Sequence, residues 1–353
     1  MCSHLQALQN FRQGLYETLT RRRDGVMDLL DGLSSQTRAT SVAEISLSPH
    51  FRRHYSALYK SIDRAYPREV EAKKRCIQAQ QVVLGKTLSP QPSGMWCWGI
   101  DATSCPRPWA ETLSDRQYVY APTPVPGQKP VTLGHRYSML SALPPQEGSQ
   151  SSTWAPPLSV EPIGSLTNDI AVAQKQIRAL LHNEACPWFG QRSVLSVDSR
   201  YSTPQFLYPL SDEKNLVILT RVRGTRVLYQ LPEAVPLGRR GRRPRYGAPF
   251  RLQEPSSWPE PTTTWTHTEA TRRGQCRTVQ GQYWPSLVMR GTQDYPMHEH
   301  PFDLIRLTYT TSTHTAPSKP LWILMWGAKR NQLPPTLHQK APSTLSLSSS
   351  FTG

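Results

Sequence analysis

The sequence contains no apolar stretch that approaches the roughly 20 residues needed to span a bilayer. Its first residues also lack the apolar core of a signal peptide, because Arg21, Arg22 and Arg23 follow a polar start. We therefore expect a cytoplasmic protein that has no membrane partner.

Acidic residues are scarce throughout the chain. The 353 residues include 41 Lys and Arg but only 25 Asp and Glu, which gives a net charge of +16, and none of the acidic residues follows Asp303. Clustered Lys and Arg gain affinity for a polyanion by releasing counterions from its phosphates. The charge therefore predicts a polyanionic partner, and it favours nucleic acid over a membrane surface.

Cysteine is too sparse to build a scaffold. The six cysteines are scattered without a CxxC pair or nearby His partners, which argues against a zinc finger and against a disulfide framework. Cys97 and Cys105 flank Asp101, and we expect a buried thiol there in preference to a reactive one. The triplet His298-Glu299-His300 has an i, i+2 spacing that fits no strong zinc motif, so we expect a solvent-facing loop.

Two aspartates each end a short apolar stretch. Asp101 follows Trp98-Gly99-Ile100, and Asp198 follows Val194-Leu195-Ser196-Val197. Either Asp alone could merely cap the loop after a strand, because Asp is a common turn former. A carboxylate at the C-terminal end of a buried strand is, however, held rigidly at a sheet edge. Two such strand ends suggest one divalent-metal site with oxygen ligands from distant segments.

Residues 1 to about 85 have apolar residues at helical spacing, and Ser41 with Glu44 offers a capping box. The pattern predicts a small helical bundle whose outer face carries Arg52 and Arg53. Such a basic face is either an ordinary solvated surface or a module that binds DNA ends, and the sequence leaves both open.

From about Met95 the pattern changes to short apolar runs separated by Pro and Gly. Strands are predicted at 117–120 and 137–143, and a helix at 168–182 leads into the strand before Asp198. The order strand, strands, helix, strand brings the two carboxylates together on adjacent strand ends. Their separation of 97 positions in the sequence (198 minus 101) is therefore no obstacle to contact.

Beyond Asp198 a buried strand is predicted at 215–223, and the densest positive cluster of the chain follows it. Arginines set among Gly and Pro form an extended arm that can follow a DNA backbone or enter a narrow minor groove. A disordered solubilising loop is the alternative, and DNA contact is favoured because the segment contains no acid. The arginines are Arg239, Arg240, Arg242, Arg243 and Arg245.

The residues around both aspartates also carry a family resemblance. The segments 95–103 and 134–137, the run VDSRYSTPQFL at 197–207 and residues 46–53 resemble bacterial insertion-sequence transposases of the DDE type, over roughly residues 5–327. This resemblance implies a ribonuclease H-like fold that cuts and joins DNA strands with two metal ions. It implies that Asp101 and Asp198 bind Mg²⁺ or Mn²⁺, that the partners are duplex DNA at transposon ends and target sites, and that the protein is associated with the nucleoid. A homodimer stays open.

The resemblance also implies the domain organisation. We expect a helical DNA-binding domain at 1–85 and an α/β, ribonuclease H-like core at 90–327. That core includes a basic, β-rich insertion at about 210–300, followed by two core strands at 302–309 and 321–326. We expect a disordered, aberrant tail at 328–353, which reads like a truncation or an out-of-frame continuation.

The third acidic ligand of the family has no counterpart that we can name. In this kind of transposase a helix bearing that Glu follows the last strand, whereas here the resemblance stops at Gly327. Glu299 and Asp303 precede the last strands, in the wrong part of the fold. Two carboxylates hold one ion weakly and do not easily position two ions about 4 Å apart, so we expect a poor or inactive nuclease.

Two alternatives to a DNA-cleaving enzyme stay open. The first is a non-catalytic, DNA-binding fragment that occupies transposon ends without cutting them. The second is a basic protein associated with RNA or chromatin, which would make the two Asp segments coincidental.

Overall fold

The computed structural model describes residues 2–19, 21–35, 41–49, 53–65, 69–121, 130–144, 155–233, 241, 243–270, 276–311 and 317–330. The chain divides into two compact units. The first consists of Met1–Leu88 and Asn183–Phe189, and the second consists of Ser89–His182 and Gly190–Gly353.

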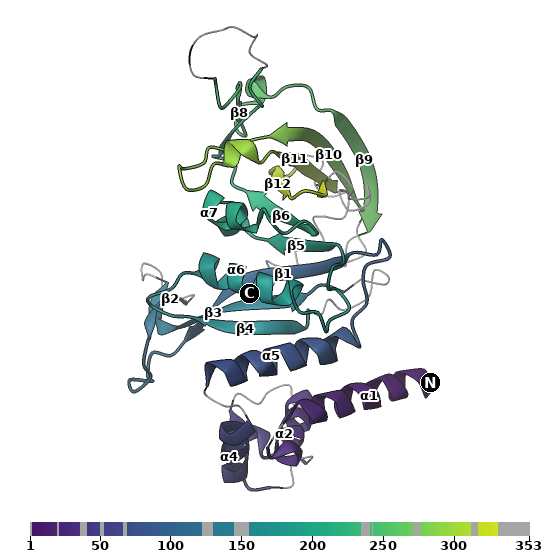
Figure 1. Cartoon of the computed structure of the whole chain (residues 1–353), viewed down its shortest axis with the longest axis vertical. Coiled ribbons are helices and arrows are strands. Elements are labelled where there is room, and N and C mark those ends of the chain that lie inside the picture. Colours follow the sequence, from purple (N-terminus) through teal and green to yellow (C-terminus); the bar gives the residue numbers. More distant parts are fainter. Residues whose placement is uncertain are drawn as a thin grey trace. The chain divides into compact units, whose positions relative to one another are not determined.

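Helices form the first unit (Figure 1). Helix α2 packs against α4, where Leu29, Ile45 and Leu58 make a small buried cluster. The Ser41 side chain caps α3 by accepting a hydrogen bond from the Glu44 backbone N–H at 3.2 Å, as its position before an apolar run predicted. Within the described residues the helices are α1 (Cys2–Thr18), α2 (Arg23–Ser35), α3 (Val42–Ile45), α4 (Tyr55–Ala65) and α5 (Val70–Gly85).

A single large sheet organises the second unit. In the described residues its strands are β1 (Trp96–Pro106), β2 (Gln117–Tyr120), β3 (Val131–Ala142), β4 (Pro157–Ile163), β5 (Ser193–Val197), β6 (Leu216–Val222), β9 (Thr263–Ala270), β10 (Cys276–Leu287), β11 (Phe302–Thr311) and β12 (Leu321–Trp326). The strand order is β2-β3-β1-β5-β6-β12-β11-β10-β9, and β4 also pairs with β3.

The middle of this sheet has the topology that the sequence predicted. Strand β3 pairs antiparallel with both β1 and β4. On the other side of β1, β5 pairs with β1 and β6 pairs with β5, both in parallel. Helix α6 (Asp169–Leu181) connects β4 to β5, and Asn168 caps it by accepting from the Ala171 N–H at 2.8 Å. This mixed α/β arrangement around a central sheet is consistent with a ribonuclease H-like core.

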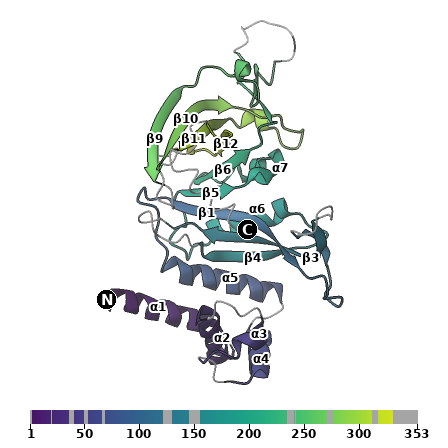
Figure 2. The same ribbon diagram turned by 180° about the vertical axis from the view of Figure 1, so that it is seen from behind.

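The strands after β6 extend the same sheet rather than forming a separate one. Strand β12 pairs with β6, and β11, β10 and β9 follow in antiparallel order. Figure 2 shows this extension as a curved layer that continues from β5 and β6. The stretch 210–300 was expected to be an insertion. Its first strand, β6, pairs in parallel with β5, so the added strands begin after Val222.

Two clusters bury the faces of the extension. Alternate residues of β12, among them Ile323 and Met325, join Ile305 and Leu307 of β11 in an aliphatic cluster that reaches across β6 to β5. Trp322, which lies between Leu321 and Ile323 of that cluster, points into a second cluster instead. The ring centroids of this second cluster are 5.2 to 6.1 Å apart. Its other members are Phe250, Trp258 and Trp284.

Short elements complete the second unit. A separate two-stranded sheet consists of β7 (Val227–Tyr229) and β8 (Pro249–Arg251). The short helices are η1 (Ser199–Tyr201), α7 (Pro204–Leu207), η2 (Tyr208–Leu210), η3 (Pro255–Ser257) and η4 (Met297–Glu299). Across the described part of the chain, no helix has both the length and the apolar character needed to cross a membrane.

A glycine in the extension gives a test of how β9 docks on the sheet. Gly281 of β10 lies opposite Trp265 of β9, and a Cβ at this glycine would overlap the Trp265 ring. We expect Gly281→Ala to lower the free energy of unfolding by about 1 to 3 kcal/mol, because the ring has to leave its place. The matched control is Gly224→Ala, where the added Cβ meets open space. Equal denaturation midpoints for the two variants would contradict the packing of Trp265 on Gly281.

Candidate active site

The two aspartates occupy neighbouring positions, although only Asp198 ends its strand as predicted. Strand β1 continues past Asp101 to Pro106, because residues 102–106 stay paired with β3. Strands β1 and β5 run parallel with Ile100 paired to Val197, so Asp101 and Asp198 are the next residues on adjacent strands. Adjacent strands are about 4.8 Å apart. The parallel register therefore brings the two carboxylates to the same sheet edge.

Local hydrogen bonds hold each carboxylate. The Ala102 backbone N–H donates to Asp101 Oδ1 at 2.8 Å, and the Arg200 backbone N–H donates to Asp198 Oδ1 at 2.9 Å. The Thr220 hydroxyl of β6 donates to the Asp198 carbonyl at 2.8 Å. Asp198 thus caps η1, as the turn interpretation expected. One bond to Oδ1 does not by itself occupy the second oxygen, so the cap and a metal site are compatible.

Burial and neighbouring charge raise the pKa of Asp101 to about 6. Burial is the largest cause, and the Asp198 and Asp169 carboxylates add to it, while the Ala102 N–H and the Arg200 guanidinium oppose it. Carboxylates that repel one another at a partly buried edge are stabilised in their charged form by a cation.

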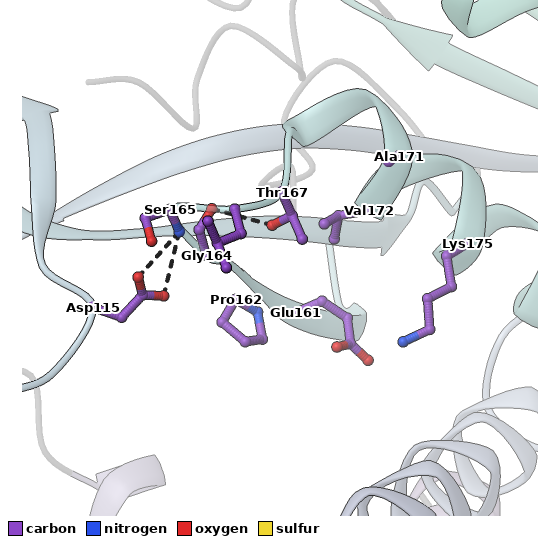
Figure 3. A pocket seen from close by; sticks show the side chains of 10 residues that line it. Asp115, Glu161, Pro162, Gly164, Ser165, Thr167, Ala171, Val172 and Lys175 are labelled. Atoms are coloured by element: carbon purple, nitrogen blue, oxygen red, sulfur yellow. Dashed lines mark hydrogen bonds between the residues drawn. The ribbon is translucent and has the colours of Figure 1, made fainter.

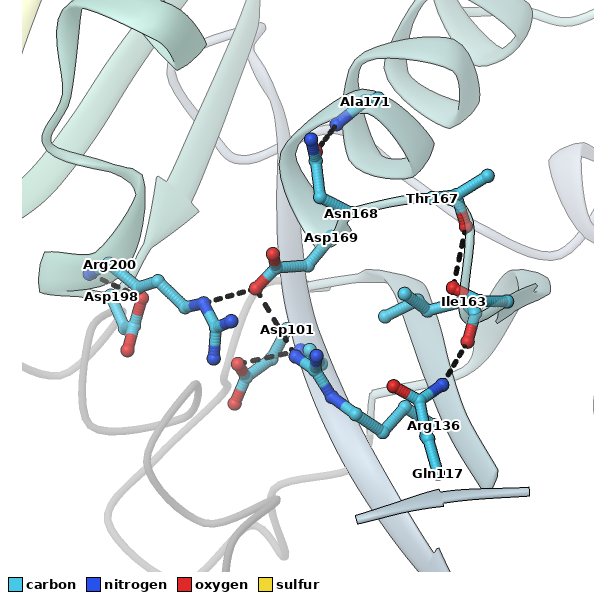
Figure 4. A network of polar contacts seen from close by, with 12 residues as sticks. Asp101, Gln117, Arg136, Ile163, Thr167, Asn168, Asp169, Ala171, Asp198 and Arg200 are labelled. Carbon is cyan, nitrogen blue, oxygen red and sulfur yellow. Dashed lines mark hydrogen bonds and ion pairs between the residues drawn. The ribbon is translucent and has the colours of Figure 1, made fainter. Parts of the chain in front are cut away.

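A third aspartate lies next to the pair. Asp169, in the first turn of α6, is buried, and its Oδ2 lies 3.4 Å from Arg136 Nη2 and forms an ion pair with Arg200 Nε. Figure 4 shows Asp169 between the two guanidinium groups, with Asp101 and Asp198 on the same side of the network. The edge therefore combines three carboxylates with two arginines.

Tyr201 adds a buried polar atom to this edge. Its side chain is fully buried, and burial together with Asp169, Asp101 and Asp198 raises the pKa of its hydroxyl. Among the described residues the hydroxyl has no hydrogen-bond partner. A buried hydroxyl without a protein partner usually bonds to an ordered water, so Tyr201 adds a neutral polar group close to the carboxylates.

The donor set at this edge fits a hard divalent cation. Mg²⁺ and Mn²⁺ prefer carboxylate oxygens and water, and Asp101 within β1 and Asp198 directly after β5 can supply such oxygens from a rigid sheet. In the part of the chain that the structure describes, no three His, Cys, Asp or Glu side chains form a ready-made metal cluster. An ion held by Asp101 and Asp198 would therefore complete its coordination with water or with phosphate oxygens.

Comparison with known protein families decides what this edge belongs to. A family model described as DDE superfamily endonuclease matches residues 14–283, which include Asp101, Asp198 and Asp169. The chain belongs to the DDE superfamily endonucleases. The resemblance to DDE-type transposases is thereby confirmed. No curated protein matches the sequence.

The acidic residues near the end of the matched region do not complete the pair. Asp303 is buried and accepts hydrogen bonds from the Tyr283 hydroxyl at 2.9 Å and the Ser286 N–H at 3.0 Å, and it forms an ion pair with Arg330 at 3.0 Å. It lies on β11, three strands from β5, which is about 14 Å at the usual strand spacing. Glu299 is 63% exposed and lies 3.5 Å from His298. Neither Asp303 nor Glu299 therefore joins the network around Asp101 and Asp198.

The expectation that the triplet His298-Glu299-His300 forms a solvent-facing loop holds for Glu299, which is 63% exposed, but not for the two histidines. The His298 side chain is only 16% exposed and lies 6.0 Å from the Tyr246 ring, while His300 packs 5.2 Å from Tyr208 and 6.4 Å from Trp326. Both imidazoles pack among aromatic rings. Their partners come from distant segments, so the local i, i+2 spacing gave no sign of this burial.

Cys97 behaves as the sequence predicted. Its thiol is buried in β1, and burial raises the pKa to about 12, so the thiol stays protonated. A protonated thiol is a weak nucleophile and a weak metal ligand. Cys97 therefore has a packing role beside Asp101.

Only some of the arginines predicted to bind DNA can be placed. Arg53 lies in the first unit, 3.4 Å from Asp28, and Arg243 and Arg245 are exposed in the second unit. The others, Arg52, Arg239, Arg240 and Arg242, lie outside the described residues. DNA binding by these arginines stays a prediction.

A pocket of about 460 Å³ lies beside β4 and the start of α6 (Figure 3). At one end the Asp115 carboxylate accepts hydrogen bonds from the Ser165 N–H, and at the other Glu161 and Lys175 approach each other. Its lining consists of Asp115, Glu161, Pro162, Gly164, Ser165, Leu166, Thr167, Ala171, Val172 and Lys175. None of the predicted site residues lines this pocket.

Sequence reasoning missed the partners of the aspartate pair. Asp169 follows the helix cap Asn168, and an acidic residue in the first turn of a helix is favoured by the helix dipole alone. Arg136 comes from β3 and Arg200 from η1, so only the tertiary fold brings them to Asp169. The one available signal was the position of Arg200, two residues after Asp198.

The raised pKa of Asp101 predicts an effect on stability without metal. The folded state binds the Asp101 proton more tightly than the unfolded chain does. Protonated Asp101 therefore contributes to the free energy of unfolding below about pH 4, and this contribution is lost as the pH rises through about 6. In buffer with a chelator, Asp101→Asn should be more stable than the wild type above pH 6. We expect about 1 kcal/mol, which allows for partial exposure, and no difference below pH 4.

Asp115→Asn is the matched control in the same denaturation series. Hydrogen bonds from Ser165 lower the pKa of Asp115, so its replacement should destabilise the protein at neutral pH. Destabilisation by Asp101→Asn above pH 6 would contradict the electrostatics described for Asp101.

Proposed function

We propose that this chain acts on duplex DNA as a transposase, by metal-dependent strand cleavage and strand transfer, with Asp101 and Asp198 as the metal ligands. One observation carries the proposal: the parallel register of β1 and β5 sets these two aspartates side by side in a DDE superfamily endonuclease. Transposase ancestry accounts for both the aspartates and the basic charge of the chain.

The residues at the edge suit this chemistry. A bound Mg²⁺ or Mn²⁺ would activate water or a 3′ hydroxyl and stabilise the charge on the scissile phosphate. Thr220 and the Arg200 N–H fix the Asp198 segment, and the Ala102 N–H fixes Asp101, so both carboxylates are held in place before a ligand arrives. Preorganised oxygen ligands reduce the reorganisation that metal binding requires.

The proposed partners are transposon ends and target DNA, with the nucleoid as the place of action. Net charge of +16 supports binding of a polyanion. The arginine-rich segment at 239–245 and the helical unit with Arg52 and Arg53 are the proposed contact surfaces. The structure describes this chain by itself, and a homodimer is an additional proposal.

We also propose that the chain cleaves slowly as it stands. Asp303 is paired with Arg330 at a distance from the pair, and Glu299 is exposed elsewhere. Asp169 is already paired with Arg136 and Arg200, so Asp101 and Asp198 have to serve where the family uses three carboxylates. The second candidate function is specific binding of DNA ends without cutting. The ion pair of the buried Asp303 with Arg330 favours it, because this carboxylate is then not available as a third metal ligand.

The metal ligands can be tested by substitution. We expect Asp101→Asn and Asp198→Asn each to remove most of the Mn²⁺ binding seen by calorimetry, and to reduce any Mn²⁺-dependent nicking of supercoiled plasmid to background, because each supplies an anionic oxygen ligand. The control is Asp212→Asn, an exposed carboxylate in the same unit. Mn²⁺ binding that survives in both site variants would reject this pair as the metal site.

Nicking and binding together separate the two candidate functions. Robust cleavage by the wild-type chain, lost in Asp101→Asn, would contradict the proposal of low activity. Retention of transposon-end DNA without cleavage in Mg²⁺ or Mn²⁺ would favour the binding function.

The arginine-rich segment gives a second test. Replacing Arg239, Arg240, Arg242, Arg243 and Arg245 together by Ala should flatten the dependence of log affinity on log salt for duplex DNA. Each lost phosphate contact should reduce the slope by about 0.9. A variant with Lys at all five positions keeps the charge and should keep the slope. An unchanged slope in the Ala variant would move the contact surface elsewhere, for which the N-terminal helices are the next candidate.

A further inference from the structure

Arg200 connects the aspartate pair to Asp169. Its backbone N–H donates to Asp198 Oδ1 at 2.9 Å, and its Nε forms an ion pair with Asp169 Oδ2. The two ends of one residue thus bind two carboxylates of the same edge (Figure 4). The conformation of Arg200 is therefore restrained both at its backbone and at its guanidinium group.

The Arg200 guanidinium is nevertheless accessible. Its side chain is 51% exposed, whereas the Asp169 side chain is only 6% exposed. A guanidinium has five N–H donors, and an ion pair through Nε leaves donors for a further ligand. The planar fork of donors matches the oxygens of a phosphate group.

Asp169 is suited to hold this arginine. It sits in the first turn of α6, where the helix dipole favours a negative charge, and Arg136 of β3 lies 3.4 Å from the same carboxylate oxygen. A buried carboxylate is tolerated when it is paired, and here two guanidinium groups share it. Arg136 therefore helps to hold Asp169 in position for Arg200.

We propose that Asp169 is a positioning residue that holds Arg200 beside Asp101 and Asp198, so that the Arg200 guanidinium binds a phosphate oxygen of the DNA at this edge. The inference rests on the proposed function, because it assumes that DNA reaches the aspartate pair. Without Asp169, a long, half-exposed arginine has to be ordered by the DNA itself, and that ordering weakens binding.

The sign of the effect separates positioning from simple electrostatics. Removing a negative charge near DNA should strengthen binding, because it reduces repulsion of the phosphates. Loss of a positioning residue should weaken it. We therefore expect Asp169→Asn to bind a short duplex of random sequence about five- to tenfold more weakly than the wild type, measured by fluorescence anisotropy in EDTA.

Glu213→Gln is the matched control. Glu213 pairs with Arg178 and His182 near the other end of α6, so this variant also removes a negative charge that is paired to the same helix. It should leave DNA affinity unchanged or raise it slightly. Asp169→Glu keeps the charge and should recover part of the lost affinity.

A double-mutant cycle tests whether Asp169 acts through Arg200. Arg200→Gln alone should weaken binding to a similar extent and reduce the salt slope by about 0.9, the value for one phosphate contact. The double variant Asp169→Asn/Arg200→Gln should be no weaker than Arg200→Gln alone. A merely structural role for Asp169 predicts additive losses and a lower Tm in every variant that lacks it.

The outcomes are distinct from those that test the function. Tighter or unchanged binding by Asp169→Asn, or additive losses in the cycle, would overturn the inference while the metal-ligand assignment stands. A wild-type chain that neither binds duplex DNA nor binds Mn²⁺ would overturn the proposed function itself. Should Asp169→Asn not fold, Arg200→Gln decides the matter, because unchanged affinity and slope in that exposed variant would remove the phosphate contact.

Discussion

The parallel pairing of β1 with β5 is the constraint on which the rest of the site depends. Side chains alternate between sheet faces, so a one-residue slip of β5 along β1 would turn Asp198 to the face opposite Asp101. Such a slip is opposed because all five residues of β5 are buried, with both faces of the strand packed. The hydrophobic core of the second unit therefore sets the geometry of the carboxylate pair, and η1 then places Arg200 relative to it.

Capping and the proposed cation binding depend on the same aspartate, Asp198. Asp198 ends β5, caps η1 through Oδ1, and is held at its carbonyl by Thr220 of β6. The Thr220 contact fixes the backbone and the Arg200 N–H fixes the side chain, which still has its second carboxylate oxygen available to a cation. An aspartate that caps a local turn is for this reason also well placed to bind a cation. The prediction that Asp198 caps the turn after its strand was correct.

The sequence predicted those features that depend on local pattern. Apolar runs and helical spacing identified β1, β5, α6, β11 and β12, and the order of these elements implied that Asp101 and Asp198 meet. Pairing between distant segments was harder to predict. Nothing local showed that β9 and β10 would join the same sheet as β6, that His300 would pack against Trp326, or that Asp169 would bind Arg136 and Arg200. These contacts depend on long-range register, for which a single sequence carries little signal.

Charge at the carboxylate edge would link the proposed metal binding to the proposed DNA binding. Asp101, Asp198 and Asp169 carry up to three negative charges there, against the two positive charges of Arg136 and Arg200. A DNA phosphate would add to the negative excess. The pKa of Asp101 is raised mainly by burial, and Asp198 and Asp169 already add to that rise without DNA. A divalent cation at Asp101 and Asp198 would reverse the balance. Because coupling between two binding events is reciprocal, a cation that favours the phosphate must in turn be bound more tightly in its presence. A weak metal site in the free chain is therefore compatible with a DNA-dependent metal enzyme.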